Sequence, residues 1–316
     1  MTPRRTWLGI DLGGTWIKWE HVADDGRSLA AGRVATPTGG HVEVTEAIAA
    51  VCAARAGEAG RPTGLGIAVP GHLTPERDGI TLLPNVSGQW RGYPARAVLA
   101  ERTGLEAVLL NDARAFAVAE LGGAAPVHGV EEVVFVTIGT GIGGALAVRG
   151  EVVSSRRDSF GELGHTSVVV DGEECGCGGR GCVEAYAGGA ALLARARARG
   201  VAVEPGAGAL TSLALAARSE PAAAQVLTEA YDAFAVGVSN ACALAGAGAV
   251  VVGGAVAEEL PGYATRLRQR LSRRRRLLGD VEVLSAALGP RAGALGAALA
   301  ARAGHVRTGE GLVLQP

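Results

Sequence analysis

The chain has 316 residues, of which 48% are hydrophobic and 19% are charged, and its formal net charge is −1. This composition is typical of a globular protein with a sizeable core, and the length favours two domains or lobes. The balanced charge argues against nucleic acid or an anionic membrane as a partner. No apolar run approaches the roughly twenty residues that span a bilayer, and no signal-peptide segment is present. We therefore expect a cytoplasmic protein.

The N-terminal part predicts a sheet. An apolar strand over Trp7–Asp11 runs into a Gly-Gly turn at Gly13-Gly14 and returns as a strand over Trp16–Val22. Two strands joined by such a turn form a hairpin. Residues 31–35 can add a third antiparallel strand, and a helical period follows from about Val42 to Ala59.

The next elements alternate between strands and helices. We predict a strand ending at Gly66–Gly71, a helix near Pro94–Thr103, a strand closing at Leu109–Asp112 and a helix over Ala113–Leu121. This alternation is typical of an α/β protein whose sheets are covered by helices.

The first pattern then recurs. A β-branched strand over Glu132–Ile138 meets the glycine-rich turn 139–144, and a strand over 145–149 returns. We interpret this as a degenerate internal repeat. The remaining predicted elements are helices over about 184–199 and 222–245, strands over 250–252 and 281–285, and a helix over 293–303. The basic run Arg273–Arg276 is interpreted as the solvated face of a helix.

Three of the five cysteines lie close to one histidine. His165, Cys175, Cys177 and Cys182 could together hold one ion. A closed Cys₃His set is typical of structural zinc, whereas a catalytic zinc would need an open coordination position. A disulfide could form on purification, but cytosolic cysteine clusters usually bind metal or act in redox reactions. The other two cysteines, at positions 52 and 242, are expected to be buried core residues.

The two hairpin turns have the composition of phosphate cradles. In Asp11-x-Gly13-Gly14-Thr15-x-x-Lys18, successive backbone N–H groups can converge on an anion, the threonine adds a donor and the lysine adds charge. Asp11 can hold Mg²⁺ or its water. The neighbouring tryptophans weaken the case for Lys18. Each turn alone is a weak signal, but their recurrence in the same strand context indicates nucleotide phosphates.

Residues Gly139, Thr140, Gly141 and Gly143 form the second of these turns, and Gly253-Gly254 is a third glycine turn. The third could admit an adenine or a ribose, or could simply allow close packing. Neither hairpin turn is a Walker loop or a dinucleotide fingerprint, because no Gly-Lys-Ser/Thr follows and a strand succeeds each turn.

Taken together, these motifs resemble the ROK family of sugar kinases and repressors. The resemblance covers nearly the whole chain, and the combination of Glu-x-Gly-His with Cys-x-Cys-Gly-x-x-Gly-Cys is highly specific. The motifs that carry it are Asp11–Thr15, Val69–Gly71, Leu83–Asn85, Asn111-Asp112, Thr137–Gly144, Glu162–His165, Cys175–Glu184 and Gly253-Gly254. It implies a two-lobed actin-like ATPase (ribonuclease H-like) fold with a cleft between the lobes.

For this chain, the resemblance implies a small lobe over 1–113, joined by the C-terminal helix 293–304, and a large lobe over 114–292 that carries the zinc site. It also implies ATP-dependent phosphorylation of a hexose at its 6-hydroxyl, with Mg²⁺ as cofactor. Asp112 would be the general base, and Asn111-Asp112 would also begin a helix as an N-cap. His165 would ligate a structural Zn²⁺ through one ring nitrogen and face the sugar with the other. The implied sugar-binding residues are Gly71, Asn85, Asn111, Asp112, Glu162, His165 and Glu184.

The substrate, the phosphoryl donor and the class of function each have alternatives. Glucose is the preferred substrate, and N-acetylmannosamine, N-acetylglucosamine, mannose and fructose are alternatives. Polyphosphate is a conceivable phosphoryl donor. A non-catalytic sugar-binding regulator is a rival of another class, against which the intact Asp112 and phosphate turns argue. Repressors of the family carry an N-terminal DNA-binding module, for which no room precedes Asp11, so we expect no nucleic-acid partner. The family also implies a homodimer or homotetramer.

Overall fold

The computed structural model describes residues 5–56, 60–123, 127, 129–155, 158–204, 206 and 208–306. The chain forms two compact units. The first comprises Met1–Ala124, Gly150–Phe160 and Pro290–Pro316, and the second comprises Ala125–Arg149 and Gly161–Gly289. The division differs from the expected one at residue 113, because helix α3 (Asp112–Gly123) and the segment 150–160 belong to the first unit.

The first unit contains a five-stranded sheet of order β3-β2-β1-β4-β7. Strands β1, β2 and β3 are antiparallel neighbours, and β4 and β7 run parallel to β1. The predicted hairpin and third antiparallel strand are therefore confirmed. The strands are β1 (Thr6–Leu12), β2 (Trp16–Ala23), β3 (Ser28–Ala35), β4 (Gly64–Val69) and β7 (Glu106–Asn111).

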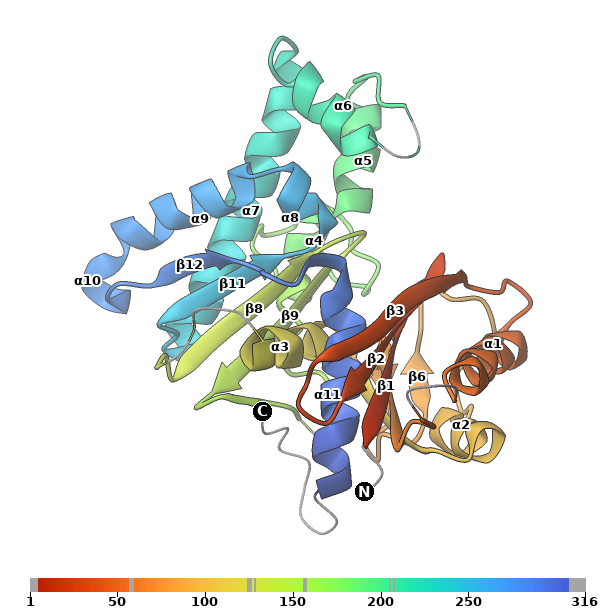
Figure 1. Cartoon of the computed structure of the whole chain (residues 1–316). Helices are drawn as coiled ribbons and strands as arrows, with labels where there is room; N and C mark the ends of the chain where they lie inside the picture. The colour runs from red at the N-terminus through yellow and green to blue at the C-terminus, as the bar shows by residue number, and fades with distance from the viewer. Residues whose placement is uncertain are drawn as a thin grey trace. The chain divides into compact units, whose positions relative to one another are not determined.

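Helices cover both faces of this sheet, with α1 and α2 on one side and α3 and α11 on the other (Figure 1). Strand β4 is buried along its whole length, which explains its continuous apolar sequence. The other elements of the unit are α1 (His41–Ala54), α2 (Ala95–Thr103), α11 (Ala292–Val306), η2 (Gly289–Arg291), and the short strands β5 (His72–Leu73), β6 (Ile80–Leu82) and β10 (Glu151–Val152). Helix α1 ends earlier than predicted, and residues 57–59 of the predicted helix lie outside the described part of the chain.

The C-terminal helix α11 packs on the sheet at backbone distance. A Cβ atom at Gly9 would lie 1.8 Å from the Ala294 carbonyl oxygen, and one at Gly66 would lie 1.8 Å from that of Ala297. Only glycine permits this approach of a strand to a helix. Residues near the end of the sequence thereby complete the core of the N-terminal unit.

The second unit repeats the pattern of the first. Strands β8 (Glu132–Ile138) and β9 (Ile142–Val148) form an antiparallel hairpin, β11 (Ala249–Gly253) runs parallel to β8, and β12 (Glu282–Ser285) runs parallel to β11. The order β9-β8-β11-β12 matches β2-β1-β4-β7 of the first unit. The predicted internal repeat is confirmed.

Alternate residues of β8 and β11, such as Val134 and Val252, share one core cluster with Phe234 and Tyr263. The helices of the unit are η1 (Leu163–His165), α4 (Val183–Ala187), α5 (Gly189–Ala198), α6 (Ala209–Ala216), α7 (Pro221–Ala245), α8 (Ala255–Glu259), α9 (Gly262–Arg273) and α10 (Arg275–Leu278). The helix predicted over 184–199 is wrong as a single element, because Gly188 adopts an extended conformation between α4 and α5.

The basic run Arg273–Arg276 spans the end of α9 and the start of α10 rather than lying on one helical face. Arg274 donates to the Ser239 hydroxyl at 2.7 Å, and its neighbours in the run are exposed. Among the helices in the described part of the chain, none is long and apolar enough to cross a bilayer.

Candidate active site and metal centre

The predicted phosphate turn of the first unit is held by hydrogen bonds to Trp16 and to Thr36. The Gly13 N–H donates to the Trp16 carbonyl at 3.0 Å, and the Thr36 hydroxyl donates to the Gly13 carbonyl at 2.7 Å. The Thr36 N–H donates to the Thr15 carbonyl at 3.0 Å. A Cβ at Gly14 would lie 2.3 Å from the Asn85 carbonyl oxygen, so this turn packs directly on a predicted sugar-binding residue.

Asp11 and Lys18 form an ion pair across the β1–β2 hairpin. Lys18 Nζ lies 3.3 Å from Asp11 Oδ2. Burial raises the pKa of the Asp11 carboxyl, and the charge of Lys18 and its hydrogen bond act in the opposite direction. A Cβ at Gly293 would lie 2.7 Å from the Asp11 carboxyl carbon, so the start of α11 packs beside this carboxylate. The structure thus pairs the lysine with the predicted Mg²⁺ ligand.

Asn111 and Asp112 lie where β7 ends and α3 begins. Asn111 Oδ1 accepts hydrogen bonds from the N–H groups of Ala113 at 3.0 Å and Arg114 at 3.4 Å, as expected of a capping side chain. The Asn111 amide also donates to the Gly71 carbonyl at 3.1 Å. Asp112 Oδ1 accepts from the Ala113 N–H at 2.8 Å. The predicted base therefore lies in the first turn of a helix, half-buried, and the predicted cap is confirmed.

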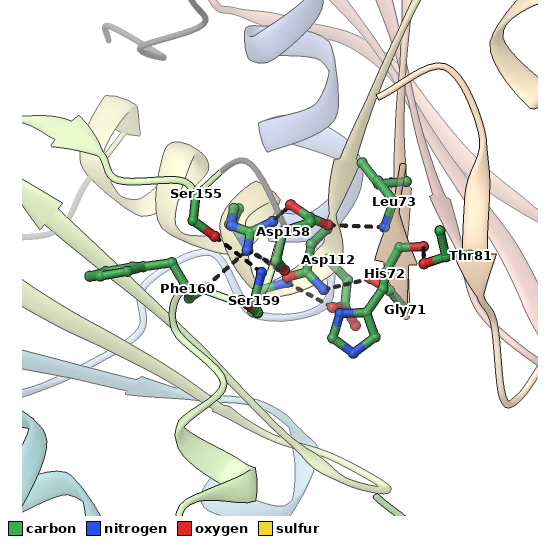
Figure 2. A network of polar contacts seen from close by, with 12 residues as sticks. Gly71, His72, Leu73, Thr81, Asp112, Ser155, Asp158, Ser159 and Phe160 are labelled. Carbon is green, nitrogen blue, oxygen red and sulfur yellow. Dashed lines mark hydrogen bonds and ion pairs between the residues drawn. The ribbon is translucent and has the colours of Figure 1, made fainter. Parts of the chain in front are cut away.

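Figure 2 shows that Asp112, Gly71 and His72 lie within one polar network with Ser155 and residues 158–160. Asp158 Oδ2 accepts from the Leu73 N–H at 3.1 Å, and Arg114 forms an ion pair with the same carboxylate. The sequence analysis missed Arg114 and Asp158. They are separated along the chain by two elements of the other unit, and no motif joins them.

In the second unit, the predicted turn 139–144 is shorter in the structure, because β9 begins at Ile142 and only residues 139–141 separate it from β8. The start of α5 holds this turn. The Gly139 N–H donates to the Gly141 carbonyl at 3.0 Å, which closes the turn. From α5, the Gly189 N–H donates to the Gly139 carbonyl at 2.9 Å and the Ala190 N–H donates to the Thr140 carbonyl at 3.0 Å. The first two residues of α5 therefore hold the carbonyl groups of Gly139 and Thr140 in place.

The third glycine turn lies against the second. Gly254 has a φ of +93°, and a Cβ there would lie 2.4 Å from the Ile138 carbonyl oxygen. Gly253 pairs in register with Thr137, and Gly143 pairs with the same residue from the other side. The predicted nucleotide-binding glycines of this unit are therefore neighbours, although they are far apart in sequence.

Glu184, predicted to bind sugar, contacts the glycine turn itself. Its Oε2 accepts a hydrogen bond from the Ile142 N–H at 2.7 Å. A Cβ at Gly141 would lie 2.3 Å from the same oxygen, so glycine at this position leaves room for the carboxylate. Glu184 therefore connects the helix after the cysteine cluster to the predicted phosphate turn. Sequence reasoning missed this connection.

Glu162 precedes the short helix η1 and His165 is its last residue, and this helix packs against Ile142, where the turn runs into β9. A Cβ at Gly164 would lie 2.3 Å from the Ile142 carbonyl oxygen. The His165 N–H donates to the Glu162 carbonyl at 3.1 Å, and His165 Nε2 lies 3.9 Å from Glu162 Oε2. The Nε2 side of the imidazole therefore faces a predicted sugar-binding carboxylate.

The other side of the His165 ring faces the cysteines. The four candidate ligand atoms of His165, Cys175, Cys177 and Cys182 all lie within 4.8 Å of one another. His165 Nδ1 lies 3.6 Å from the Cys175 sulfur, and the sulfurs of Cys177 and Cys182 are 3.7 Å apart. Tetrahedral zinc with Zn–S bonds of about 2.3 Å requires S···S separations of about 3.8 Å. The donor set and its spacing therefore fit a four-coordinate zinc ion.

The loop that carries the cysteines is shaped by its glycines. Gly178 and Gly181 have positive φ, and a Cβ at Gly181 would lie 1.7 Å from the Val169 carbonyl oxygen. The Gly179 N–H donates to the Cys177 sulfur at 3.4 Å and lowers the pKa of that thiol. This hydrogen bond stabilises the thiolate of Cys177, the form that binds metal, whereas burial raises the pKa of the Cys175 and Cys182 thiols.

Comparison with known proteins identifies the same family as the sequence motifs. The ROK family model matches residues 7–303. The chain belongs to the ROK family. It is 33% identical to the glucokinase of Streptomyces coelicolor over 319 residues, which covers 93% of this chain and 97% of that protein. It is 31% identical to the N-acetylmannosamine kinase of Escherichia coli O139:H28, over 94% of this chain and 98% of that one.

Among solved structures, the chain resembles a ROK family glucokinase from Streptomyces griseus in complex with glucose and AMPPNP. The TM-score is 0.77 at 32% identity, over 94% of this chain and 99% of the other. This ROK protein therefore has the actin-like ATPase fold that its motifs predict. Its two repeated sheets are the core of that fold.

Proposed function

We propose that this ROK protein is a sugar kinase that transfers the γ-phosphoryl group of ATP to the 6-hydroxyl of a hexose. The observation that carries the proposal is Asp112, a half-buried carboxylate fixed in the first turn of α3 by a capped helix start. The two glycine turns, built on equivalent hairpins, support the nucleotide half of the proposal.

In this proposal Asp112 accepts the proton of the attacking sugar hydroxyl as the oxygen bonds to phosphorus. A positioned general base typically contributes 10²–10⁴-fold to the rate. Bound Mg²⁺ and ATP would supply the phosphoryl group and neutralise its charge. Asp11 is the carboxylate suited to hold Mg²⁺ or its water, and Lys18 pairs with this half-buried group in the protein.

The phosphate groups of ATP are assigned to the backbone of the glycine turns. These residues are Gly13, Gly14 and Thr15 in the first unit and Gly139, Thr140, Gly141 and Gly143 in the second. Gly254, which lies against Ile138, would border the nucleoside. The support is that each turn is held by hydrogen bonds from outside it, so its backbone is preorganised for an anion.

Sugar hydroxyls are assigned to Gly71, Asn85, Asn111, Glu162, His165 and Glu184, in addition to Asp112. Asn111 already donates one amide hydrogen to Gly71 and has a second to offer. Glu184 uses one carboxylate oxygen for Ile142 and carries another. Polar groups held in this way reject an analogue that lacks the matching hydroxyl, because they would be left unpaired.

Zinc in the Cys₃His cluster would have an orienting role. The ion would bind Nδ1 of His165, the nitrogen that faces Cys175, and leave the proton on Nε2. His165 then becomes a fixed hydrogen-bond donor. A closed set of four protein ligands has no open position for substrate, so the chemistry stays with Asp112.

We propose glucose as the substrate and an N-acetylated hexosamine as the second candidate. A glucokinase and an N-acetylmannosamine kinase match the chain at similar identity and coverage. The test is ADP release by the wild-type protein with ATP and Mg²⁺, across glucose, mannose, fructose, N-acetylmannosamine and N-acetylglucosamine. We predict the highest kcat/KM with glucose. A higher value with an N-acetylated sugar would reassign the substrate, and ADP release with none of them would favour a sugar-binding regulator.

A further inference from the structure

Arg114 and Asp158 form an ion pair that is almost completely removed from solvent. Their side chains are 2% and 1% exposed. The Arg114 guanidinium also donates to the backbone carbonyls of Asp158 and Phe160, each at 2.9 Å. Asp158 has a φ of +54°, an uncommon conformation for a residue with a side chain. One side chain of α3 thus holds three acceptors of the segment 158–160.

This ion pair closes a ring of contacts around the proposed base. Arg114 lies in the same first turn of α3 as Asp112, and its partner Asp158 accepts from the Leu73 N–H at 3.1 Å. Two residues before Leu73, the Gly71 carbonyl accepts from Asn111, the residue that caps α3. Figure 2 shows Gly71, Leu73, Asp112 and Asp158 in one network. The start of α3 therefore contacts the segment Gly71–Leu73 on both sides of Asp112, through Asn111 and through Arg114 with its partner Asp158.

A buried ion pair is a poor device for stability alone. Removing two charges from water costs about as much as their attraction returns, and well-packed apolar residues often stabilise a protein more. What the pair adds is direction, because a guanidinium donates its hydrogen bonds in its own plane. The geometry here fixes the rotation and position of one helical turn.

We propose that Arg114 and Asp158 are positioning residues for the phosphoryl transfer, which act by holding Asp112 at the correct distance from the sugar hydroxyl. The inference rests on the proposed function. It adds that the ion pair affects turnover through Asp112 and not through substrate affinity. A displacement of about 1 Å at a catalytic group can cost on the order of 100-fold in rate.

The test compares Arg114→Met and Asp158→Asn with the wild type. Asparagine tolerates the positive φ of Asp158 and its amide oxygen can still accept from Leu73. This variant therefore keeps the shape of the side chain and removes its charge, and it lowers Tm because the buried Arg114 guanidinium loses its counter-charge. Both variants should lose on the order of 10- to 100-fold in kcat, with KM for sugar and ATP changed less than threefold. Arg114→Lys retains the charge without the fork and should recover only part of the loss. If Arg114→Met does not fold, Asp158→Asn and Arg114→Lys carry the test.

The decisive arm introduces Asp158→Asn into the Asp112→Asn background. If the ion pair acts through Asp112, the double variant and Asp112→Asn alone have equal kcat, because Asp158→Asn has no further effect once the base is lost. Multiplying effects, or an unchanged kcat with a lower Tm, would overturn the inference. Glu20→Gln is the control, since Glu20 is 1% exposed and paired with Arg291 in the same unit, and its kcat should match the wild type. A wild-type protein without turnover would refute the proposed function instead.

Discussion

Replacing Asp112 with Asn is expected to lower kcat by about 10²–10⁴-fold, the contribution of a positioned general base. The amide has the shape of the carboxylate but cannot take a proton from a sugar hydroxyl. Because Asn111 supplies the helix cap through its own side chain, α3 should still begin at the same residue. Sugar binding, measured by titration calorimetry, should change by no more than a few-fold.

The loss of a negative charge at a helix start has a cost of its own, about 0.3–1 kcal/mol of stability. Glu43→Gln controls for it, because Glu43 is an acidic residue in the first turn of α1 in the same unit. That variant should keep the wild-type kcat. Turnover within a few-fold of the wild type in Asp112→Asn would remove Asp112 from the role of base.

Loss of the metal is the second large effect that we expect. The purified protein should contain about one zinc ion per chain, held by the four ligands of a structural site. Cys182→Ser, which alters a proposed zinc ligand that is 1% exposed, should release the ion and lower Tm. The kcat/KM for sugar should fall by about 10- to 100-fold or more, because His165 and Glu162 lose their support.

Cys242→Ala is the matched control for this variant. Cys242 is a buried free cysteine of the same unit that lies on α7, outside the metal cluster. Zinc content, measured by elemental analysis, and sugar affinity should both be retained. If the wild-type protein keeps full activity and full sugar affinity after a chelator has removed its metal, the orienting role of the metal is refuted.

Local sequence patterns predict much of this fold because both halves of the repeat have the same recognisable pattern. Both hairpins carry a glycine turn between two apolar strands, and β-branched or apolar runs mark the buried parallel strands. Such signals need only short-range information. The same holds for the cysteine cluster, whose ligands lie close together in sequence and meet in the structure.

The break between α4 and α5 was not predictable from pattern. The Ala-rich sequence continues through Gly188, but a Cβ there would lie 3.0 Å from the Glu184 carbonyl oxygen and 3.1 Å from that of Thr140. The break lets the start of α5 donate to the turn 139–144. Tertiary contacts of this kind override local helix propensity.

The part of the candidate site that sequence reasoning missed consists of long-range polar contacts. The sequence motifs predict only a sugar-binding role for Glu184, whereas its carboxylate also accepts from the Ile142 N–H. Arg114 has the appearance of an ordinary helical residue, and only the placement of 150–160 in the first unit gives it a partner. A single charged residue has no local signal for burial, so such pairs emerge only from the three-dimensional structure.

The most direct test of the central claim is to follow ATP and glucose with the wild-type protein and Mg²⁺ by ³¹P NMR. We predict that the γ-phosphate signal of ATP disappears as the signals of ADP and a hexose 6-phosphate grow in equal amounts, and that none of these changes occurs without sugar. If sugar binds in the calorimeter and no sugar phosphate forms with glucose or any of the other hexoses, the protein is a sugar-binding regulator and the claim of phosphoryl transfer is wrong.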